Sequence, residues 1–115
     1  WQMKTFVMMT RIAPVDADII DITNKLKAHS RDSSAWLEEI NKSCPEVKVL
    51  AHYAILGPYD FMCIYEAPDE KVAAKVSLLS RARGAFQVES WHAIPTREII
   101  DLVEGLLPSV DAIQS

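Results

Sequence analysis

Glycine, cysteine and histidine are scarce in this sequence, with three, two and three copies among 115 residues. With so few glycines, the chain has no glycine-rich phosphate loop, and the Gly-x-Ser-x-Gly turn of many hydrolases is also absent. Cys44 and Cys63 are too few and too far apart for a zinc-site pattern. We expect two reduced thiols, Cys63 buried in a strand and Cys44 exposed before Pro45. The histidines show no close ligand spacing, so we predict neither a metal nor another cofactor.

The sequence also lacks a strong basic cluster and a long apolar run. The formal net charge is -4, and the densest basic spot is Arg81-Ala-Arg83, which suits the end of a helix. No helix-turn-helix pattern is present, so we expect no nucleic-acid partner. No apolar run approaches about 20 residues and no export signal is visible, which predicts no membrane span and a cytoplasmic location. Met3-Lys4 is a plausible natural start, which would make Trp1-Gln2 upstream sequence.

What the sequence does contain is enough apolar residues, half of the total, for one domain over residues 1–115. Apolar periodicity and turn signals predict the order strand, helix, strand, strand, helix, strand, helix. This order matches the ferredoxin-like βαββαβ plan, an α+β fold with helices on one face of a four-stranded antiparallel sheet, plus a C-terminal helix. The polar stretch 29–34 either kinks the first helix or divides it. Strands are predicted at 4–12, 46–56, 61–66 and 85–94, and helices at 15–28 and 35–43. A further helix starts at Pro68-Asp69-Glu70 and ends at Gly84 as a left-handed cap, and the last runs from Pro95 onward with Ile99, Ile100, Val103, Leu106 and Leu107 inward.

The two strands expected at the centre of the sheet are apolar on both of their faces. Phe6 and Met8 alternate with Val7 and Met9 in one strand, and the other strand, 61–65, has the same character. With helices on one face only, the second face would be a large apolar patch in a single copy. Such patches usually mark an interface, so we predict a homodimer or a higher homo-oligomer.

The turn between the second and third strands carries Gly57, Tyr59 and Asp60, followed after a strand by Glu66-Ala67-Pro68-Asp69. Glycine permits the positive φ that a sharp reversal can need, and a short carboxylate can accept hydrogen bonds from nearby backbone groups. From Thr5 to about Trp91 the chain resembles the GYD-domain family, and the turn is similar to one in the effector-binding domains of Lrp/AsnC-type regulators. The resemblance implies a dimeric α/β barrel made of two sheets packed back to back. It implies no catalytic residue set.

A candidate ligand site follows if the relevant strand residues face away from the helices. In that case His52, Glu89, Trp91 and Arg11 would line the space between subunits, where their polar groups would need partners such as a bound anion or small acid. Tyr59 either plugs the end of the barrel or faces this ligand. The predicted ligand-binding residues are Arg11, His52, Tyr59, Asp60, Glu89 and Trp91.

Two function classes remain open. We favour a non-catalytic oligomeric module that binds a small metabolite or a partner protein. The alternative is a cofactor-independent enzyme of the dimeric α/β-barrel type, an isomerase or monooxygenase, with His52 or His92 as the base. An enclosed cavity with one of these histidines pointing into it would favour the enzyme, and a filled interior would favour the binding module.

Overall fold

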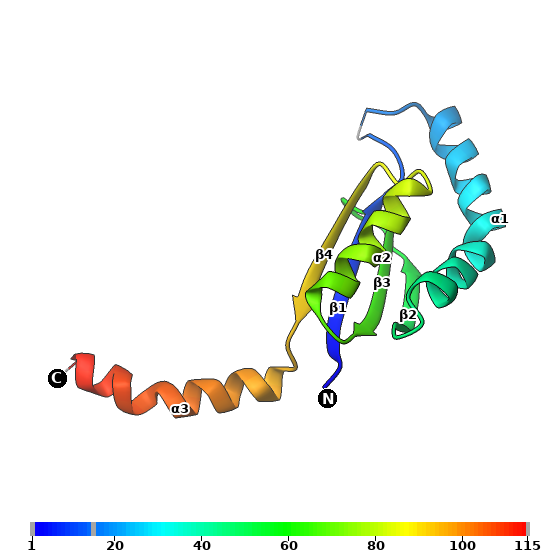
Figure 1. Cartoon of the computed structure of the whole chain (residues 1–115). Helices are drawn as coiled ribbons and strands as arrows, with labels where there is room; N and C mark the ends of the chain where they lie inside the picture. The colour runs from blue at the N-terminus through cyan, green and yellow to red at the C-terminus, as the bar shows by residue number, and fades with distance from the viewer. Residues whose placement is uncertain (1, 15, 115) are drawn as a thin grey trace.

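A four-stranded antiparallel sheet with two helices packed on one face forms the body of the protein (Figure 1). The structure, a computed structural model, describes residues 2–14 and 16–114, apart from the side chains of residues 29–34. The strand order β2-β3-β1-β4 is that of the predicted ferredoxin-like α+β fold, which is thereby confirmed. The elements are β1 (Lys4–Arg11), α1 (Ile19–Ser43), β2 (Lys48–Ala54), β3 (Phe61–Ala67), α2 (Glu70–Ala82), β4 (Gln87–Ala93) and α3 (Thr96–Gln114).

Short carboxylates and one glycine set the limits of the helices that cover the sheet. The carboxylates of Asp18 and Asp69 cap α1 and α2 by accepting hydrogen bonds from backbone N–H groups of the first turn. Gly84 ends α2 with a φ of +104°, the left-handed conformation predicted for it. The question left open at residues 29–34 is resolved, because α1 continues through them as one helix.

The core lies between the sheet and these two helices. Its largest fully buried side chains come from β3, α1 and α2 and from the residue that follows α1: Tyr65, Cys63, Ile40, Val76 and Cys44. Cys63 is thus buried as predicted. The expectation of an exposed Cys44 is wrong, because this residue is the C-cap of α1 and its N–H donates to the Ile40 carbonyl at 2.8 Å, which keeps the chain turned inward.

The opposite face of the sheet, which we call the open face, has no helix packed on it in the described chain. Strand pairing sets Val7 of β1 beside Ile64 of β3 and Trp91 of β4, and sets Met9 beside Met62. Phe6 and Met8, the alternate residues of β1, belong to the core instead. The centre of the open face is therefore apolar, as expected from the sequence. Its apolar residues are Val7, Met9, Ala51, Tyr53, Met62, Ile64 and Trp91.

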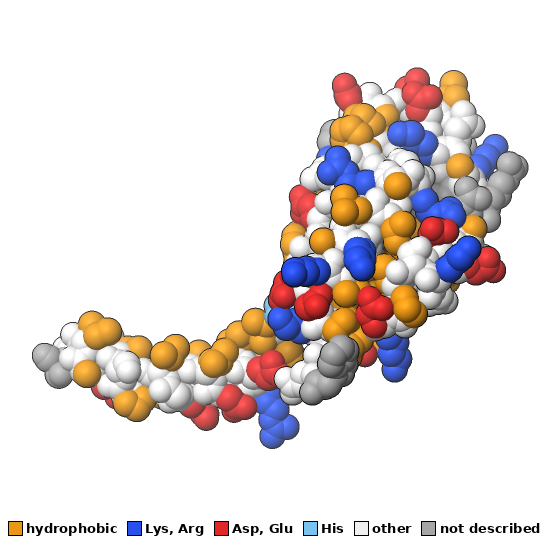
Figure 2. Space-filling view, viewed as in Figure 1, with side chains coloured by type: hydrophobic (Ala, Val, Ile, Leu, Met, Phe, Trp, Pro, Cys, Tyr) orange, Lys and Arg blue, Asp and Glu red, His pale blue; other side chains and the backbone are white. Residues whose placement is uncertain are grey.

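Helix α3 leads away from the end of β4 and leaves the body of the protein (Figure 1). The prediction that its apolar residues point inward is wrong for the single chain, because none of its described residues is buried. Figure 2 shows most apolar side chains of α3 along its upper edge and acidic side chains along its lower edge. No helix in the described part of the chain combines the length and hydropathy needed to cross a membrane.

The molecule is accordingly extended for its length. Its radius of gyration is 18.1 Å, whereas a compact chain of this length has about 13 Å. Its accessible surface is 8076 Å², whereas a folded monomer of this mass has about 6,300 Å². Part of the difference is surface on α3, none of whose described residues is buried.

Candidate functional site

The turn between β2 and β3 is fixed to the end of β1 by hydrogen bonds from both its backbone and its side chains. The Asp60 N–H donates to the Thr10 carbonyl at 2.9 Å, and one oxygen of the Asp60 carboxylate, Oδ2, accepts from the Ile12 N–H, also at 2.9 Å. The Arg11 side chain donates from Nε to the Pro58 carbonyl. Asp60 and Arg11, both predicted ligand-binding residues, therefore hold the turn in place.

Gly57 in this turn does not have the positive φ expected of it. Among the described residues, Gly84 is the one glycine with positive φ. A Cβ atom added at Gly57 would have no other atom within 4 Å. Neither backbone conformation nor space within the single chain therefore requires glycine at this position.

Tyr59, Glu89 and Trp91 form a small cluster at the open face, on the side of β4. The Tyr59 hydroxyl donates to Glu89 Oε2 at 2.7 Å, and Gln87 Nε2 donates to the other carboxylate oxygen at 2.8 Å. The hydrogen bond to Glu89 raises the pKa of Tyr59. The rings of Tyr59 and Trp91 meet edge to face with centroids 6.3 Å apart. The polar groups expected to need a ligand thus have partners within the chain, and ligand binding here stays a prediction.

His52 lies on the other face of the sheet from this cluster. It pairs with the buried Cys63 across β2 and β3, and its ring lies 5.5 Å from that of Trp36 and 5.9 Å from that of Phe61. A register shift between Val49 and Ala51 sets the facing of this part of β2. Desolvation lowers the pKa of His52, which favours the neutral imidazole at neutral pH. The structure therefore brings Tyr59, Glu89 and Trp91 together and separates His52 from them.

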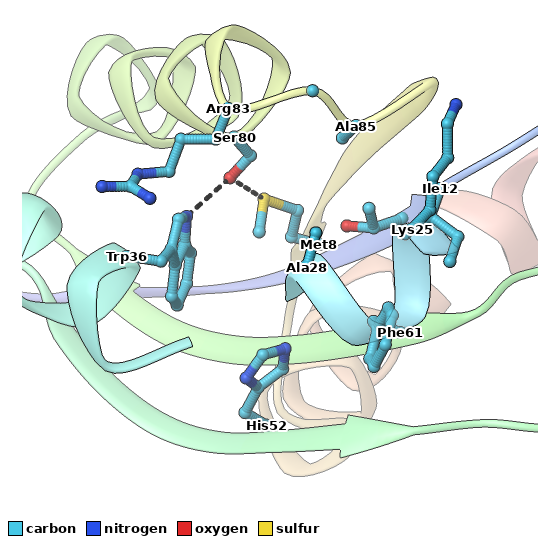
Figure 3. A pocket seen from close by; sticks show the side chains of 12 residues that line it. Met8, Ile12, Lys25, Ala28, Trp36, His52, Phe61, Ser80, Arg83 and Ala85 are labelled. Carbon is cyan, nitrogen blue, oxygen red and sulfur yellow. Dashed lines mark hydrogen bonds between the residues drawn. The ribbon is translucent and has the colours of Figure 1, made fainter. Parts of the chain in front are cut away.

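A cavity of about 290 Å³ opens beside His52, between α1, the sheet and the end of α2 (Figure 3). On one side the Trp36 indole Nε1 donates to Ser80 Oγ at 3.1 Å and joins α1 to α2. The sequence does not reveal this cavity, because its walls come from segments far apart in the chain and none of these segments carries a motif. Its described lining residues are Met8, Thr10, Ile12, Lys25, Ala28, Trp36, His52, Phe61, Ser80, Arg83, Gly84 and Ala85.

The other residues considered for chemistry lie outside this cavity. The His92 ring packs against Phe6 with centroids 5.2 Å apart, and His92 is not among the residues that line the cavity. In the described part of the chain, no group of three or more His, Cys, Asp or Glu side chains could hold a metal ion. Burial raises the pKa of Cys63 to about 12, so this thiol is not a nucleophile at neutral pH.

Comparison with known proteins agrees with the fold and with the turn at Gly57, Tyr59 and Asp60. The family model of the GYD domain matches residues 6–103, and the chain belongs to this family. Among curated proteins it is similar to the glutamine synthetase and cystathionine beta-lyase binding protein of Thermus thermophilus. The two are 36% identical over 101 residues, which covers 85% of this chain and 96% of that protein. No solved structure matches the chain.

Proposed function

We propose that this protein is a non-catalytic, homo-oligomeric module that binds a partner protein and acts in the cytoplasm. The observation that carries the oligomeric part is the open face, an apolar sheet surface centred on Val7, Met62 and Ile64 with no helix packed on it in the described chain. Contiguous apolar patches of this kind are rare on monomers and usually mark interfaces. The partner-binding part is supported by the similarity to a GYD-type binding protein.

The area available supports association between copies. The accessible surface of 8076 Å² exceeds the value typical of a monomer of this mass by about 1,800 Å². A standard stable interface buries about 800 Å² on each partner. Each copy thus has enough surplus surface for the open face and α3 both to be covered by other copies.

A second copy packed on the open face would give the back-to-back arrangement expected from the sequence. In that arrangement the half-exposed Trp91 and the Tyr59–Glu89 pair lie at the border of the interface. We propose that they contribute a polar border around the apolar centre, which is the usual anatomy of such interfaces. A small acid held between subunits by Arg11 or Glu89 remains a narrower proposal for the same space.

The assembly is tested by a charge placed at the centre of the open face. We expect Ile64→Glu to dissociate the oligomer to a 12.9 kDa chain, since a carboxylate cannot be buried there without a partner. Sedimentation velocity measures the mass, and circular dichroism checks the fold. Leu78→Glu is the matched control, because Leu78 is exposed on α2 and belongs to the helix side. An Ile64→Glu protein that is folded and still assembled like the wild type would refute the oligomeric proposal.

The partner proposal is tested with glutamine synthetase and cystathionine beta-lyase, the two enzymes after which the Thermus thermophilus relative is named. Purified glutamine synthetase and cystathionine beta-lyase from the source organism would each be immobilised and probed with the wild-type oligomer by biolayer interferometry. We expect saturable binding to at least one of them and none to serum albumin. Absence of binding to both enzymes would contradict the transfer of partner class from the relative and leave the oligomer test unaffected.

An enzymatic function is the second candidate, because a cavity with His52 in its wall is the arrangement that this alternative requires. A lowered pKa leaves His52 neutral and able to accept a proton at neutral pH. Proton-transfer chemistry also needs a second acid or base near the substrate. The described lining residues include no Asp, Glu or Tyr, and for that reason we place binding before catalysis.

A further inference from the structure

The cavity beside His52 has a mostly apolar interior, and a few polar side chains also line it. Met8, Ile12 and Trp36 supply apolar walls from β1, the segment after it and α1 (Figure 3). Its volume of about 290 Å³ is close to the lower end of the range for small-molecule sites and equals that of roughly ten waters of the bulk liquid. The space therefore suits a compact organic molecule.

Thr10 gives this interior an unused hydrogen-bonding group. It is 8% exposed and lines the cavity. Its backbone carbonyl accepts from Asp60, but its hydroxyl makes no hydrogen bond with any residue that the structure describes. Since buried polar groups are nearly always hydrogen-bonded, this hydroxyl is available to a molecule that enters the cavity.

The charged side chains among the described lining residues of the cavity are all positive. Lys25 of α1 and Arg83 at the end of α2 both belong to its lining, and no carboxylate does among the described residues. Neither Lys25 nor Arg83 forms an ion pair with a described residue. The one salt bridge among the described residues joins Lys4 to Glu70. This contrasts with the net charge of -4 of the whole chain. A positive rim on an acidic protein favours an anionic ligand.

We propose that this cavity binds a small monocarboxylic acid with an apolar or aromatic body. The apolar body occupies the space among Met8, Trp36 and Phe61, the Thr10 hydroxyl forms a hydrogen bond with the ligand, and Lys25 and Arg83 attract its carboxylate. The site lies within one chain, on the opposite face of the sheet from the proposed interface. It is therefore separate from the proposed interface between copies.

The probe is 4-phenylbutyrate, titrated into the wild-type protein by isothermal titration calorimetry, with 4-phenylbutyramide as its uncharged counterpart. A ligand of about twelve non-hydrogen atoms is expected to bind with a Kd of about 1 mM or below. The acid should bind about tenfold more tightly than the amide, because each partly exposed cation contributes about two- to fivefold. A larger effect is not expected at so open a rim.

Two sets of variants locate the binding. Lys25→Gln with Arg83→Gln should weaken acid binding about tenfold and leave amide binding unchanged. Its matched control is Lys27→Gln with Arg81→Gln, which removes the same charge from exposed positions of α1 and α2 outside the cavity. Thr10→Val keeps the shape of the side chain and should weaken both probes about fivefold through the lost hydrogen bond.

Three results would overturn the proposal. The first is no detectable binding of either probe at about ten times the expected Kd. The second is equal affinity for acid and amide, which would exclude the anionic class. The third is an equal loss of acid binding in both double variants, which would show a general charge effect rather than a site.

Discussion

Tyr65 and Cys63 show how burial in this core is coupled to ionisation. Both side chains are fully buried on the helix side of β3, and burial raises the pKa of each to about 12. The Tyr65 hydroxyl still reaches the Ala73 carbonyl at 3.4 Å, whereas Cys63 behaves as a small apolar side chain. Both groups are therefore neutral in the folded protein over the whole physiological pH range.

Stability should fall at alkaline pH for this reason. In the unfolded chain the pKa of Cys is near 9 and that of Tyr near 10. In the folded chain the pKa of both Cys63 and Tyr65 is about 12. The contribution of Cys63 is complete below about pH 9 and that of Tyr65 below about pH 10. Above these values each is lost by about 1.4 kcal/mol per pH unit until about pH 12. Urea unfolding at about pH 8, 9 and 10 measures it. Cys63→Ala should flatten the decline between about pH 9 and 10, and an unchanged slope in this variant would contradict the assignment.

Individual residues differed in how far the sequence could place them. The sequence predicts the buried Cys63 and the left-handed Gly84, because strand pattern and helix ending are local properties. It fails for Cys44, whose burial depends on how α1 ends. The sequence also does not reveal the cavity beside Trp36 and Ser80. The hydrogen bond between these two side chains joins residues 44 positions apart. The pairing of Tyr59 with Glu89 is equally non-local.

At the scale of elements, the turn between β2 and β3 is attached to the end of β1 by hydrogen bonds. Its Asp60 is the acidic residue of the GYD turn, and both its carboxylate and its backbone N–H bond to the last residues of β1 or the one just after it. The Arg11 side chain reinforces this attachment from β1 to Pro58. Asp60 of the family motif thus has a structural role, which is to hold the turn against the end of β1.

Removal of the Asp60 carboxylate should destabilise the sheet. Asp60→Ala leaves the Ile12 N–H without its acceptor, which we expect to cost about 1.5–3 kcal/mol in the free energy of unfolding. Asp60→Asn keeps an acceptor and should lose less. Urea unfolding measures both, and the exposed Asp16→Ala serves as the control. A change of under about 0.5 kcal/mol for Asp60→Ala would show that the hydrogen bond is not structural.

The order and type of the elements could be predicted because hydrophobic periodicity and capping residues are local signals. The continuity of α1 through residues 29–34 could not be predicted, because the polar residues there are compatible with either a kinked helix or two separate helices. The facing of His52 could not be predicted either. It depends on which alternate set of β2 residues meets the helices, and on the register shift after Val49.

At the scale of the whole molecule, α3 is a helix with no buried residue among those that the structure describes. Its apolar residues recur at spacings of three and four, which is the pattern of a helix packed against another surface. Nothing described in the single chain receives this side, and Pro108 inside the helix removes one backbone hydrogen bond. A helix of this kind is marginal in water without a partner. The apolar edge consists of Ile99, Ile100, Val103, Leu106, Leu107, Val110 and Ile113.

Thermal stability should therefore increase with protein concentration. Because association stabilises only folded chains, we expect the wild-type Tm to rise by a few degrees over about a hundredfold increase in concentration. Val103→Glu with Leu106→Glu should reduce this dependence, whereas Arg97→Glu, a charge change elsewhere on α3, should keep it. Differential scanning fluorimetry measures all three. A Tm that is the same at every concentration for the wild type would show that α3 and the open face remain solvated.

The register shift in β2 also influences how copies can meet. Strands β2 and β4 form the two borders of the sheet, where backbone N–H and C=O groups have no strand beyond them in the described chain. A straight border can recruit further chains side by side without limit, which leads to fibrils. The irregularity between Val49 and Ala51 breaks the regular ladder spacing along one border. Growth by strand addition along this border is thereby discouraged.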